Sequence, residues 1–300
     1  MKNKTPSVSI LVSSCDAYQD AWFPFFTLLQ KYWPDRPYPV YLSTERKVAP
    51  EIAGVKIYTL NCFSKNAAWS ARLAHALRQI HSKYVLFFLE DFFLLEPVDG
   101  KEIARCAEMM DRDPKIANVN FGKGSDIPVT ERIDEDYAVR DRDTLYYLNA
   151  QCALWRRKTL LKLLNPYESA WQMELYGSRR AKWSPYKFVV RTNDKRVVFY
   201  HANATYGVGI RQGKWLPGNR ELFRKEGISV NLDRLGVETE APPETDILPP
   251  KRTTFYEKIL RLRYAGEDTP RWELKDQRVL FFSHPIQYLK KKRHALRNPY

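Results

Sequence analysis

The sequence lacks the features by which several classes of protein are recognised. It has only four cysteines, more than forty residues apart, so no Cys-x-x-Cys pair can build a zinc or redox centre: Cys15, Cys62, Cys106 and Cys152. It has no run of about 18 apolar residues, which argues against a membrane-spanning helix. The stretch 84–95 comes closest, and two acids interrupt it. Signatures of common RNA- and DNA-binding modules are also missing.

Acidic residues are scarce in one half of the chain. The 49 basic and 35 acidic residues give a net charge of +14. Residues 1–150 contribute 19 basic and 20 acidic groups, whereas residues 151–300 contribute 30 and 15. A basic excess of this size suggests an anionic partner such as a nucleotide, a nucleic acid or a phospholipid surface. The few cysteines, and an apolar start too short for a secretory signal, predict a cytoplasmic protein.

Apolar runs and helical periodicities alternate along the first two thirds of the chain. Strands are predicted at residues 7–13, 39–42, 55–60, 84–89, 116–121 and 146–155. Helices are predicted after Asp20 up to Pro34, and at 67–81, 101–110 and 158–164. This order predicts an α/β fold with an open, mostly parallel, Rossmann-type sheet and helices on both faces. Residues 122–144, rich in charge and turn residues, are expected to form a loop over the sheet.

The composition changes after residue 235. The stretch VETEAPPETDILPPKR is acidic and rich in proline, as in a linker. The last fifty residues then contain 13 basic and 5 acidic groups together with aromatic residues. We therefore expect a domain at 1–235 and a linker with a basic C-terminal extension at 236–300. The extension either lies on an anionic membrane surface or packs back on the domain.

Two adjacent acids, Glu90 and Asp91, directly follow the apolar strand at 84–89. Ligands of open α/β sheets bind at the carboxyl ends of the strands. Burying two neighbouring carboxylates is costly unless a cation or hydrogen-bond donors compensate them. Either they hold Mg²⁺ or Mn²⁺ against a diphosphate, or they accept hydrogen bonds from the backbone or an arginine without a metal.

Four segments together carry a resemblance to a known family. They are SCDAY at 14–18, WSARL at 69–73 ahead of LEDFFL at 89–94, WQMELYGS at 171–178, and GIRQGKW at 209–215. In this order the sequence resembles bacterial glycosyltransferases of the GT-A fold that act in polysaccharide or lipopolysaccharide biosynthesis. The resemblance spans about residues 7–235. It implies a GT-A-like domain that binds a nucleotide-sugar.

The resemblance also implies a divalent cation, Mn²⁺ or Mg²⁺. Glu90 and Asp91 occupy the place of the family's Asp-x-Asp motif, but Phe92 replaces its last acid. Asp91 would be the main ligand and Glu90 its support. His201, after another apolar run, would be the late histidine that completes the metal site. A hydrogen-bonded histidine at a strand end is the alternative.

Further residues would bind the donor if the resemblance holds. Candidate nucleotide-sugar contacts are Ser14, Asp16, Tyr18, Trp69, Arg72, Glu90, Arg211 and Lys214. A tyrosine ring can stack on the base, and a guanidinium or a flexible basic loop can neutralise the diphosphate. The alternatives are that Asp16 caps a turn, that Arg72 pairs with Asp91, and that residues 207–214 form a solvated surface turn.

Glu174 is the candidate general base. It lies in the segment that resembles the base-carrying region of inverting GT-A enzymes, and it is the only acid between Glu168 and Asp194. An acceptor hydroxyl must lose its proton as it attacks the anomeric carbon, and a desolvated carboxylate within hydrogen-bond reach can take it. Trp171, just before it, is the candidate acceptor contact. The alternative is a capping or ion-paired Glu174.

The expected function is transfer of a sugar from a nucleoside diphosphate donor, with a UDP-sugar favoured, to a hydroxyl of a surface glycan or a lipid-linked precursor. The expected place is the cytoplasm, including the inner face of the membrane, without a nucleic-acid partner. Two other functions remain open. One is a non-catalytic or a nucleic-acid- or glycan-binding protein on the same fold, and the other is a metal-dependent hydrolase that uses Glu90 and Asp91.

Overall fold

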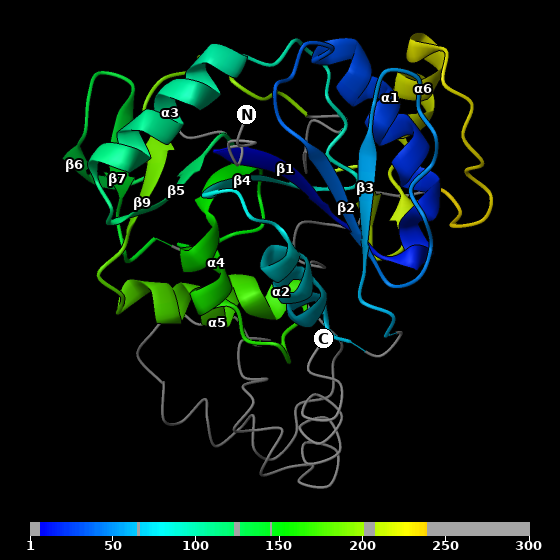
Figure 1. Cartoon of the computed structure of the whole chain (residues 1–300). Helices are drawn as coiled ribbons and strands as arrows, with labels where there is room; N and C mark the ends of the chain where they lie inside the picture. Colours follow the sequence, from blue (N-terminus) through cyan, green and yellow to red (C-terminus); the bar gives the residue numbers. More distant parts are fainter. Residues whose placement is uncertain (1–6, 65–66, 123–126, 145, 201–207, 239–300) are drawn as a thin grey trace, which may run out of the picture.

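A mixed β-sheet forms the centre of the molecule. The computed structural model describes residues 7–64, 67–122, 127–144, 146–200 and 208–238. Within them, nine strands form a sheet in the order β3-β2-β1-β4-β8-β5-β9-β7-β6 (Figure 1). The strands are β1 (Val8–Ser13), β2 (Val40–Thr44), β3 (Ile57–Asn61), β4 (Tyr84–Leu89), β5 (Ile116–Asn120), β6 (Val129–Arg132), β7 (Tyr137–Arg140), β8 (Ala153–Arg156) and β9 (Lys187–Arg191). A separate hairpin pairs β10 (Ile210–Arg211) with β11 (Lys214–Trp215).

Most strands of the sheet run in one direction. β3, β2, β1 and β4 are parallel neighbours, and β5 is parallel to β9. Only β8, between β4 and β5, and β7, between β9 and β6, run the opposite way. The predicted open, mostly parallel α/β sheet is therefore confirmed. Its strand order reverses after β1, which lies between β2 and β4.

Helices cover both faces of this sheet (Figure 1). One face carries α1 (Trp22–Tyr32), α3 (Gly100–Arg112) and α6 (Gly218–Glu226), whose apolar side chains join one core. The other carries α2 (Trp69–Gln79), α4 (Arg157–Leu163) and α5 (Ala170–Lys182), whose apolar side chains join a second core. Among these described residues, no helix is long and apolar enough to cross a membrane.

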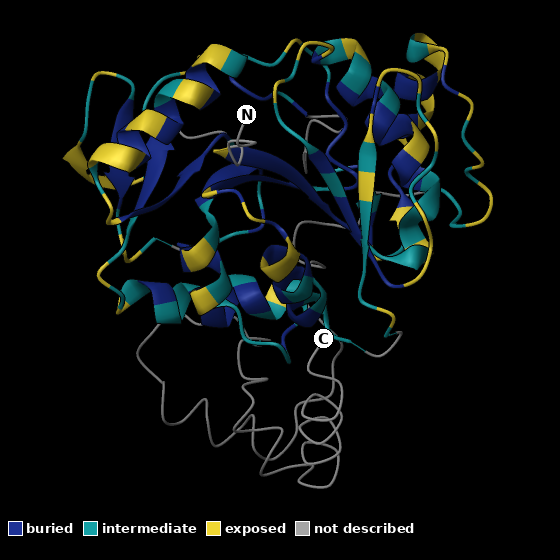
Figure 2. Ribbon diagram, in the orientation of Figure 1, coloured by how far each residue is buried: buried dark blue, intermediate teal, exposed yellow. Residues whose placement is uncertain are grey.

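The continuous apolar sequence of β4 follows from its place between the two cores. Leu86 and Phe88 enter the core beneath α1 and α3, whereas Val85 and Phe87 enter the core beneath α2. Successive side chains of a strand point to opposite faces, so a strand covered by helices on both sides has no polar face (Figure 2). The two acids come where this apolar strand ends.

Two expectations about local structure were wrong. Residues 122–144 are not all loop, because β6 and β7 lie within them and β7 is buried beside β9. The Tyr137 hydroxyl donates to Glu102 on α3 at 2.9 Å, which anchors β7 to the core. Residues 146–152 are not strand. There the N–H of Leu148 donates to the Ser178 hydroxyl of α5 at 3.0 Å instead of to a neighbouring strand.

The domain extends slightly beyond residue 235. Val237 forms a parallel bridge with Trp215, and the N–H of Glu238 donates to the Trp215 carbonyl at 2.9 Å. Residues 239–300, which hold the rest of the predicted linker and the basic extension, lie outside the described residues. The expected membrane contact of that extension stays a prediction.

Candidate active site

Several polar segments meet at the carboxyl edge of the central strands. Ser13, at the end of β1, is level with Ser43 on β2 and with Leu89 on β4. Phe87 on β4 is level with Ala153, the first residue of the antiparallel β8. The residues that follow β1, β2 and β4 and those that precede β8 therefore lie along one edge. This is where open α/β sheets bind ligands.

Glu90 and Asp91 form a buried pair of acids at this edge. Each residue is only 6% exposed. Burial, and then the charge of Asp91, raises the pKa of Glu90 well above its usual value. Burial raises the pKa of Asp91 to about 6, although hydrogen bonds from the backbone N–H groups of Ile210, Asp91 and Gly209 oppose the rise. At neutral pH this pair therefore favours binding a proton or a positive group.

Asp91 holds the β10–β11 hairpin against the sheet. Its Oδ2 accepts hydrogen bonds from the N–H of Ile210 at 2.9 Å and of Gly209 at 3.2 Å. The Gly209 N–H also lies 3.0 Å from the Asp91 carbonyl. A Cβ on Gly209 would lie 2.4 Å from the Phe93 ring, so only glycine fits this approach. The described part of the glycine-rich segment thus contains a packed hairpin, and the contact of its basic residues with a diphosphate stays a prediction.

Glu45, which was not among the predicted site residues, lies near the two acids at the end of β2. It is buried one residue after the strand and forms an ion pair with Arg72 of α2 at 3.2 Å. Arg72 also donates to the Ala67 carbonyl at 2.8 Å, and its charge acts on Glu90. The predicted end of the strand at residue 42 hid Glu45, because Thr44 is the true end. An acid right after a buried strand is the same signal that identified Glu90.

Asp16 fixes the loop that follows β2. Its Oδ1 accepts hydrogen bonds from the backbone N–H groups of residues 45, 46 and 47 at 3.1–3.2 Å. Burial tends to raise the pKa of Asp16, but these donors lower it below its usual value. The backbone N–H of Asp16 in turn donates to Glu45. Asp16 therefore binds the backbone of the loop that follows β2 and does not cap the helix that follows β1.

The other residues predicted after β1 take different places. Ser14 accepts a hydrogen bond from the Trp22 indole at 2.7 Å and is buried, so it secures the start of α1. Tyr18 is half-buried in the short helix η1 (Asp16–Ala21). Burial, then Cys15, Glu90 and Asp91, raises the pKa of Tyr18, so its hydroxyl lies within the electrostatic reach of the acids.

Glu174 projects from α5 toward the segment that precedes β8. Its Oε1 accepts the N–H of Ala150 at 2.8 Å. Burial raises the pKa of Glu174 to about 7, against the lowering effect of that hydrogen bond. A carboxyl with this pKa can take up and release a proton near neutral pH. Trp171, in the first turn of α5, is 55% exposed and faces solvent.

Contacts at the start of α5 set the position of Glu174. Ser169 and Gln172 form a reciprocal capping box, which fixes where the helix begins. The buried Glu168 forms a two-pronged ion pair with Arg180, both distances being 2.6 Å. Glu168 is therefore the ion-paired acid at the start of α5, whereas Glu174 accepts a backbone N–H and its role as base stays a prediction.

A polar segment links Glu174 to the acids of β4. In it, Asn149 accepts a hydrogen bond from Asn120 of β5 at 2.9 Å. The Tyr200 hydroxyl donates to Gln151 at 2.8 Å and accepts the N–H of Cys152 at 3.2 Å. The Tyr200 ring stacks on Phe92 with the ring centres 4.5 Å apart. Phe92 is thus a core residue, and its packing ties the segment before β8 to the residue after Asp91.

The described residues alone do not make up a metal site. Nowhere in them do three histidine, cysteine or acidic side chains group so that they could hold an ion. Glu90 and Asp91 offer two carboxylates, and Asp91 already accepts two backbone N–H groups. His201, the predicted third ligand, lies outside the described residues. The divalent cation therefore stays a prediction, and no chemical step is derived through it.

The remaining predicted donor contacts differ in exposure. Arg211 is buried and forms an ion pair with Glu238 at 2.5 Å, whereas Lys214 is exposed on β11. Trp69 of α2 is partly buried and packs on Phe87 with the ring centres 6.2 Å apart. Lys214 is thus the cation of the hairpin that faces solvent.

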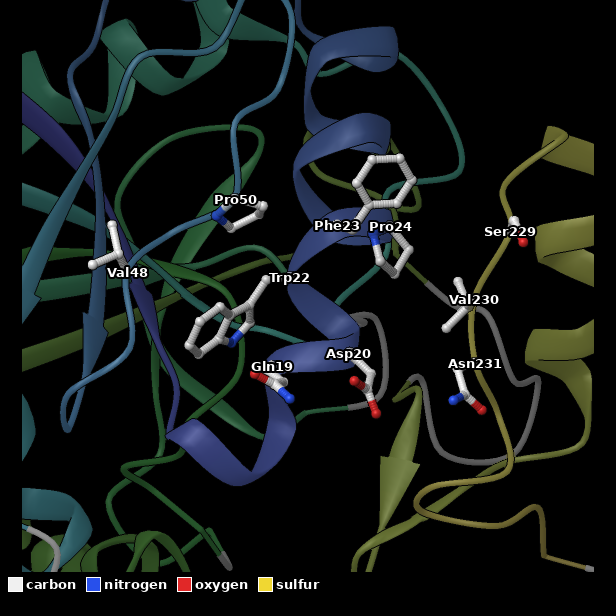
Figure 3. Close-up of a pocket in the computed structure, with 10 residues that line it drawn as sticks. All are labelled: Gln19, Asp20, Trp22, Phe23, Pro24, Val48, Pro50, Ser229, Val230 and Asn231. Carbon is white, nitrogen blue, oxygen red and sulfur yellow. The ribbon is translucent and has the colours of Figure 1, made fainter.

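A pocket of about 330 Å³ opens on the α1 side of the same end of the sheet. It lies between the start of α1, the loop after β2 and residues 229–231 after α6 (Figure 3). Its apolar lining includes Phe23 and Pro24 of α1 and Val48 and Pro50 of the loop after β2. The pocket is lined by none of the candidate acids Glu45, Glu90, Asp91 and Glu174.

No protein-family model and no curated protein matches the chain. Among solved structures it is similar to S. aureus TarS 1–349, with 15% identity and a TM-score of 0.39 over 64% of this chain and 59% of that one. A longer TarS structure gives 13% identity and 0.42 over 64% and 36%. A CMP:2-keto-3-deoxy-manno-octonic acid synthetase complexed with CTP gives 11% and 0.34 over 65% and 92%. The chain thus spans less than two thirds of the TarS structures, and with TM-scores below 0.5 these likenesses assign it no activity.

Proposed function

We propose that the chain is a glycosyltransferase that moves a sugar from a nucleoside diphosphate, UDP being favoured, to a hydroxyl of a glycan or a lipid-linked acceptor. The observation that carries the proposal is the Glu174 carboxyl, whose burial raises its pKa to about 7 beside the segment that leads into β8. That segment borders the edge where Glu45, Glu90 and Asp91 follow their strands. A base and a set of buried acids thus face one ligand-binding edge.

The proposed chemistry is a direct displacement. Glu174 takes the proton of the acceptor hydroxyl as its oxygen forms a bond to the anomeric carbon. The bond from that carbon to the diphosphate oxygen breaks, and its electron pair leaves with the nucleoside diphosphate. A base whose pKa lies near the working pH is well matched to this transfer. Attack from the side opposite the leaving group inverts the anomeric configuration.

Cationic side chains are proposed to bind the diphosphate. Arg72 projects to this edge from α2, where it pairs with Glu45 and where its charge acts on Glu90. A guanidinium has the planar donor geometry that suits phosphate oxygens. Lys214, exposed on the hairpin that Asp91 holds in place, is the second candidate. Tyr18 lies close enough to these acids to contact a nucleoside at the same edge.

The test is sugar transfer by the purified chain. Radiolabelled UDP- and GDP-sugars are incubated with an envelope glycolipid extract, with and without Mn²⁺, and incorporation into the extract is measured. Glu174→Gln keeps the size of the side chain and an oxygen that can accept the Ala150 N–H, but it removes the base. It is expected to lower turnover by roughly 10²–10⁴-fold. Glu108→Gln, an exposed acid on α3, is the matched control and is expected to keep full turnover.

Three outcomes would contradict the proposal. One is the absence of incorporation from every donor. Another is turnover of Glu174→Gln equal to that of the control variant. The third is release of the nucleoside diphosphate at the same rate with and without the acceptor extract, which would identify a hydrolase instead.

A further inference from the structure

The helices on the two faces of the sheet differ in charge. Together α2, α4 and α5 contain eight basic residues and one acidic residue, Glu174. Together α1, α3 and α6 contain seven basic and five acidic residues. Glu174 is turned toward the Ala150 backbone. The first three helices, which pack against one another (Figure 1), thus form a surface of one sign, here called the α2–α4–α5 face.

Part of this positive charge stays at the surface. Arg72 and Arg180 pair with buried acids. Lys158 and Lys162, one turn apart on α4, are exposed, and so is Arg78 on α2. Because these three side chains project from neighbouring helices, their charges add over one area rather than being scattered around the molecule.

An exposed tryptophan lies at the end of this face. Trp183, directly after α5, is 85% exposed, the highest exposure among the large hydrophobic side chains described. The exposed Arg142 donates to the carbonyls of Lys182 and Ser184 on either side of it, at 2.8 and 3.0 Å. The Lys182 ammonium lies 5.9 Å from the indole ring centre. Lys182 also pairs with the exposed Asp143, so the outward-facing indole is flanked by Arg142 and by the Lys182–Asp143 ion pair.

We propose that the α2–α4–α5 face docks on an anionic lipid bilayer, with Trp183 entering the interface and Lys158, Lys162 and Arg142 contacting headgroups. Indole rings favour the interfacial layer, where an apolar body and a polar N–H are both satisfied. Lysine and arginine beside them are attracted by the negative surface potential of anionic lipids. The face supplies both, without an exposed acid on its helices.

A bilayer fits this face better than two other occupants. The last fifty residues of the chain have a basic excess themselves, so their charge does not complement it. A nucleic acid would use the cations, but its contacts to phosphate do not call for an isolated exposed indole at the end of a helix. The docking does not depend on the proposed transfer reaction, and its readout is separate from turnover.

The test is binding of the 300-residue chain to phosphatidylcholine vesicles with and without about 30% phosphatidylglycerol, at low and high salt. Binding is expected only to the anionic vesicles and is expected to weaken with salt. Lys158→Gln combined with Lys162→Gln is expected to weaken binding about 30-fold, since each surface cation contributes about a fivefold factor. Trp183→Ser is expected to weaken it as well.

A double variant on the opposite face of the sheet tests whether the position of the cations matters or only their number. Lys101→Gln combined with Arg112→Gln removes two exposed cations from α3 and is expected to change binding less than about twofold. The proposal would be overturned if both double variants lost the same amount of vesicle binding. It would also be overturned if the α4 double variant lost none, because the binding would then belong to another part of the chain. Equal binding to neutral vesicles, or retention of a DNA or RNA duplex in preference to anionic vesicles, would overturn it too.

Discussion

Replacing Glu174 by glutamine is expected to stabilise the fold above neutral pH. In the folded protein, burial raises the pKa of Glu174 from 4.5 to about 7. An unfolded chain exposes the same group to water, where it ionises near its usual value. Between these two values the unfolded state releases the proton and the folded state keeps it, so ionisation favours unfolding.

The magnitude follows from the size of the shift. About 2.5 pKa units at 1.36 kcal/mol each correspond to about 3 kcal/mol. Below pH 4.5 the carboxyl is protonated in both states, and the stabilising contribution of the raised pKa is fully present. It is lost as the pH rises through the window from 4.5 to 7. The neutral amide of Glu174→Gln does not titrate and avoids this loss.

The assay is urea unfolding followed by circular dichroism between about pH 4 and pH 8. The variant and the wild type are expected to have equal unfolding free energies near pH 4. The variant is expected to be more stable by about 3 kcal/mol near pH 8. Glu108→Gln, exposed on α3, is expected to follow the wild type at every pH. A constant offset between Glu174→Gln and the wild type across the range would refute the raised pKa and, with it, the poised base.

Three further substitutions test the surroundings of the site. Gly209→Ala is expected to cost about 1–3 kcal/mol of unfolding free energy, because its Cβ would lie 2.4 Å from the Phe93 ring. Gly213 has open space around it but a φ of +83°, so Gly213→Ala is expected to cost only about 1 kcal/mol of unfolding free energy. If urea unfolding showed Gly213→Ala to be the more destabilising of the two variants, the close packing at Gly209 would be contradicted. Arg72→Gln removes the cation paired with Glu45 and is expected to weaken nucleoside diphosphate binding at least 10-fold by calorimetry. Unchanged affinity would exclude it from the diphosphate contact.

Strands β1 and β4 of the parallel half could be predicted because each is a largely apolar run that is buried on both faces. The predicted strand at 84–89 coincides with β4, and the first strand differs from β1 by one residue. A strand buried on both faces needs no partner to be recognisable, since its sequence has no polar face. Helix α3 was also predicted closely, from its apolar periodicity.

The second half of the sheet was harder to predict because it depends on distant partners. β7 follows the acids Asp134 and Asp136, which bind Arg105 of α3, and nothing local distinguishes that cluster from a solvated turn. Likewise, Asp20, after which a helix was predicted, pairs with Arg234, 214 residues further along the chain. Contacts between residues so far apart in the sequence depend on the fold and cannot be read from local sequence spacing.

The candidate site was predicted in part. Burial raises the pKa of three predicted site residues, Glu90, Asp91 and Glu174. Their catalytic and metal-binding roles stay predictions. Asp16 and Ser14 bond to neighbouring elements, and Glu45 was missed. A strand end wrongly placed by two residues was enough to hide one of the acids.

Titration of the purified chain with UDP, GDP and CMP by calorimetry, with and without Mn²⁺, tests whether the carboxyl edge of β1, β2 and β4 binds the donor nucleotide. Saturable binding of at least one of the three is expected, weakened by Arg72→Gln and unchanged by Glu108→Gln. Failure to bind any of them, with or without the metal, would contradict donor binding at this edge.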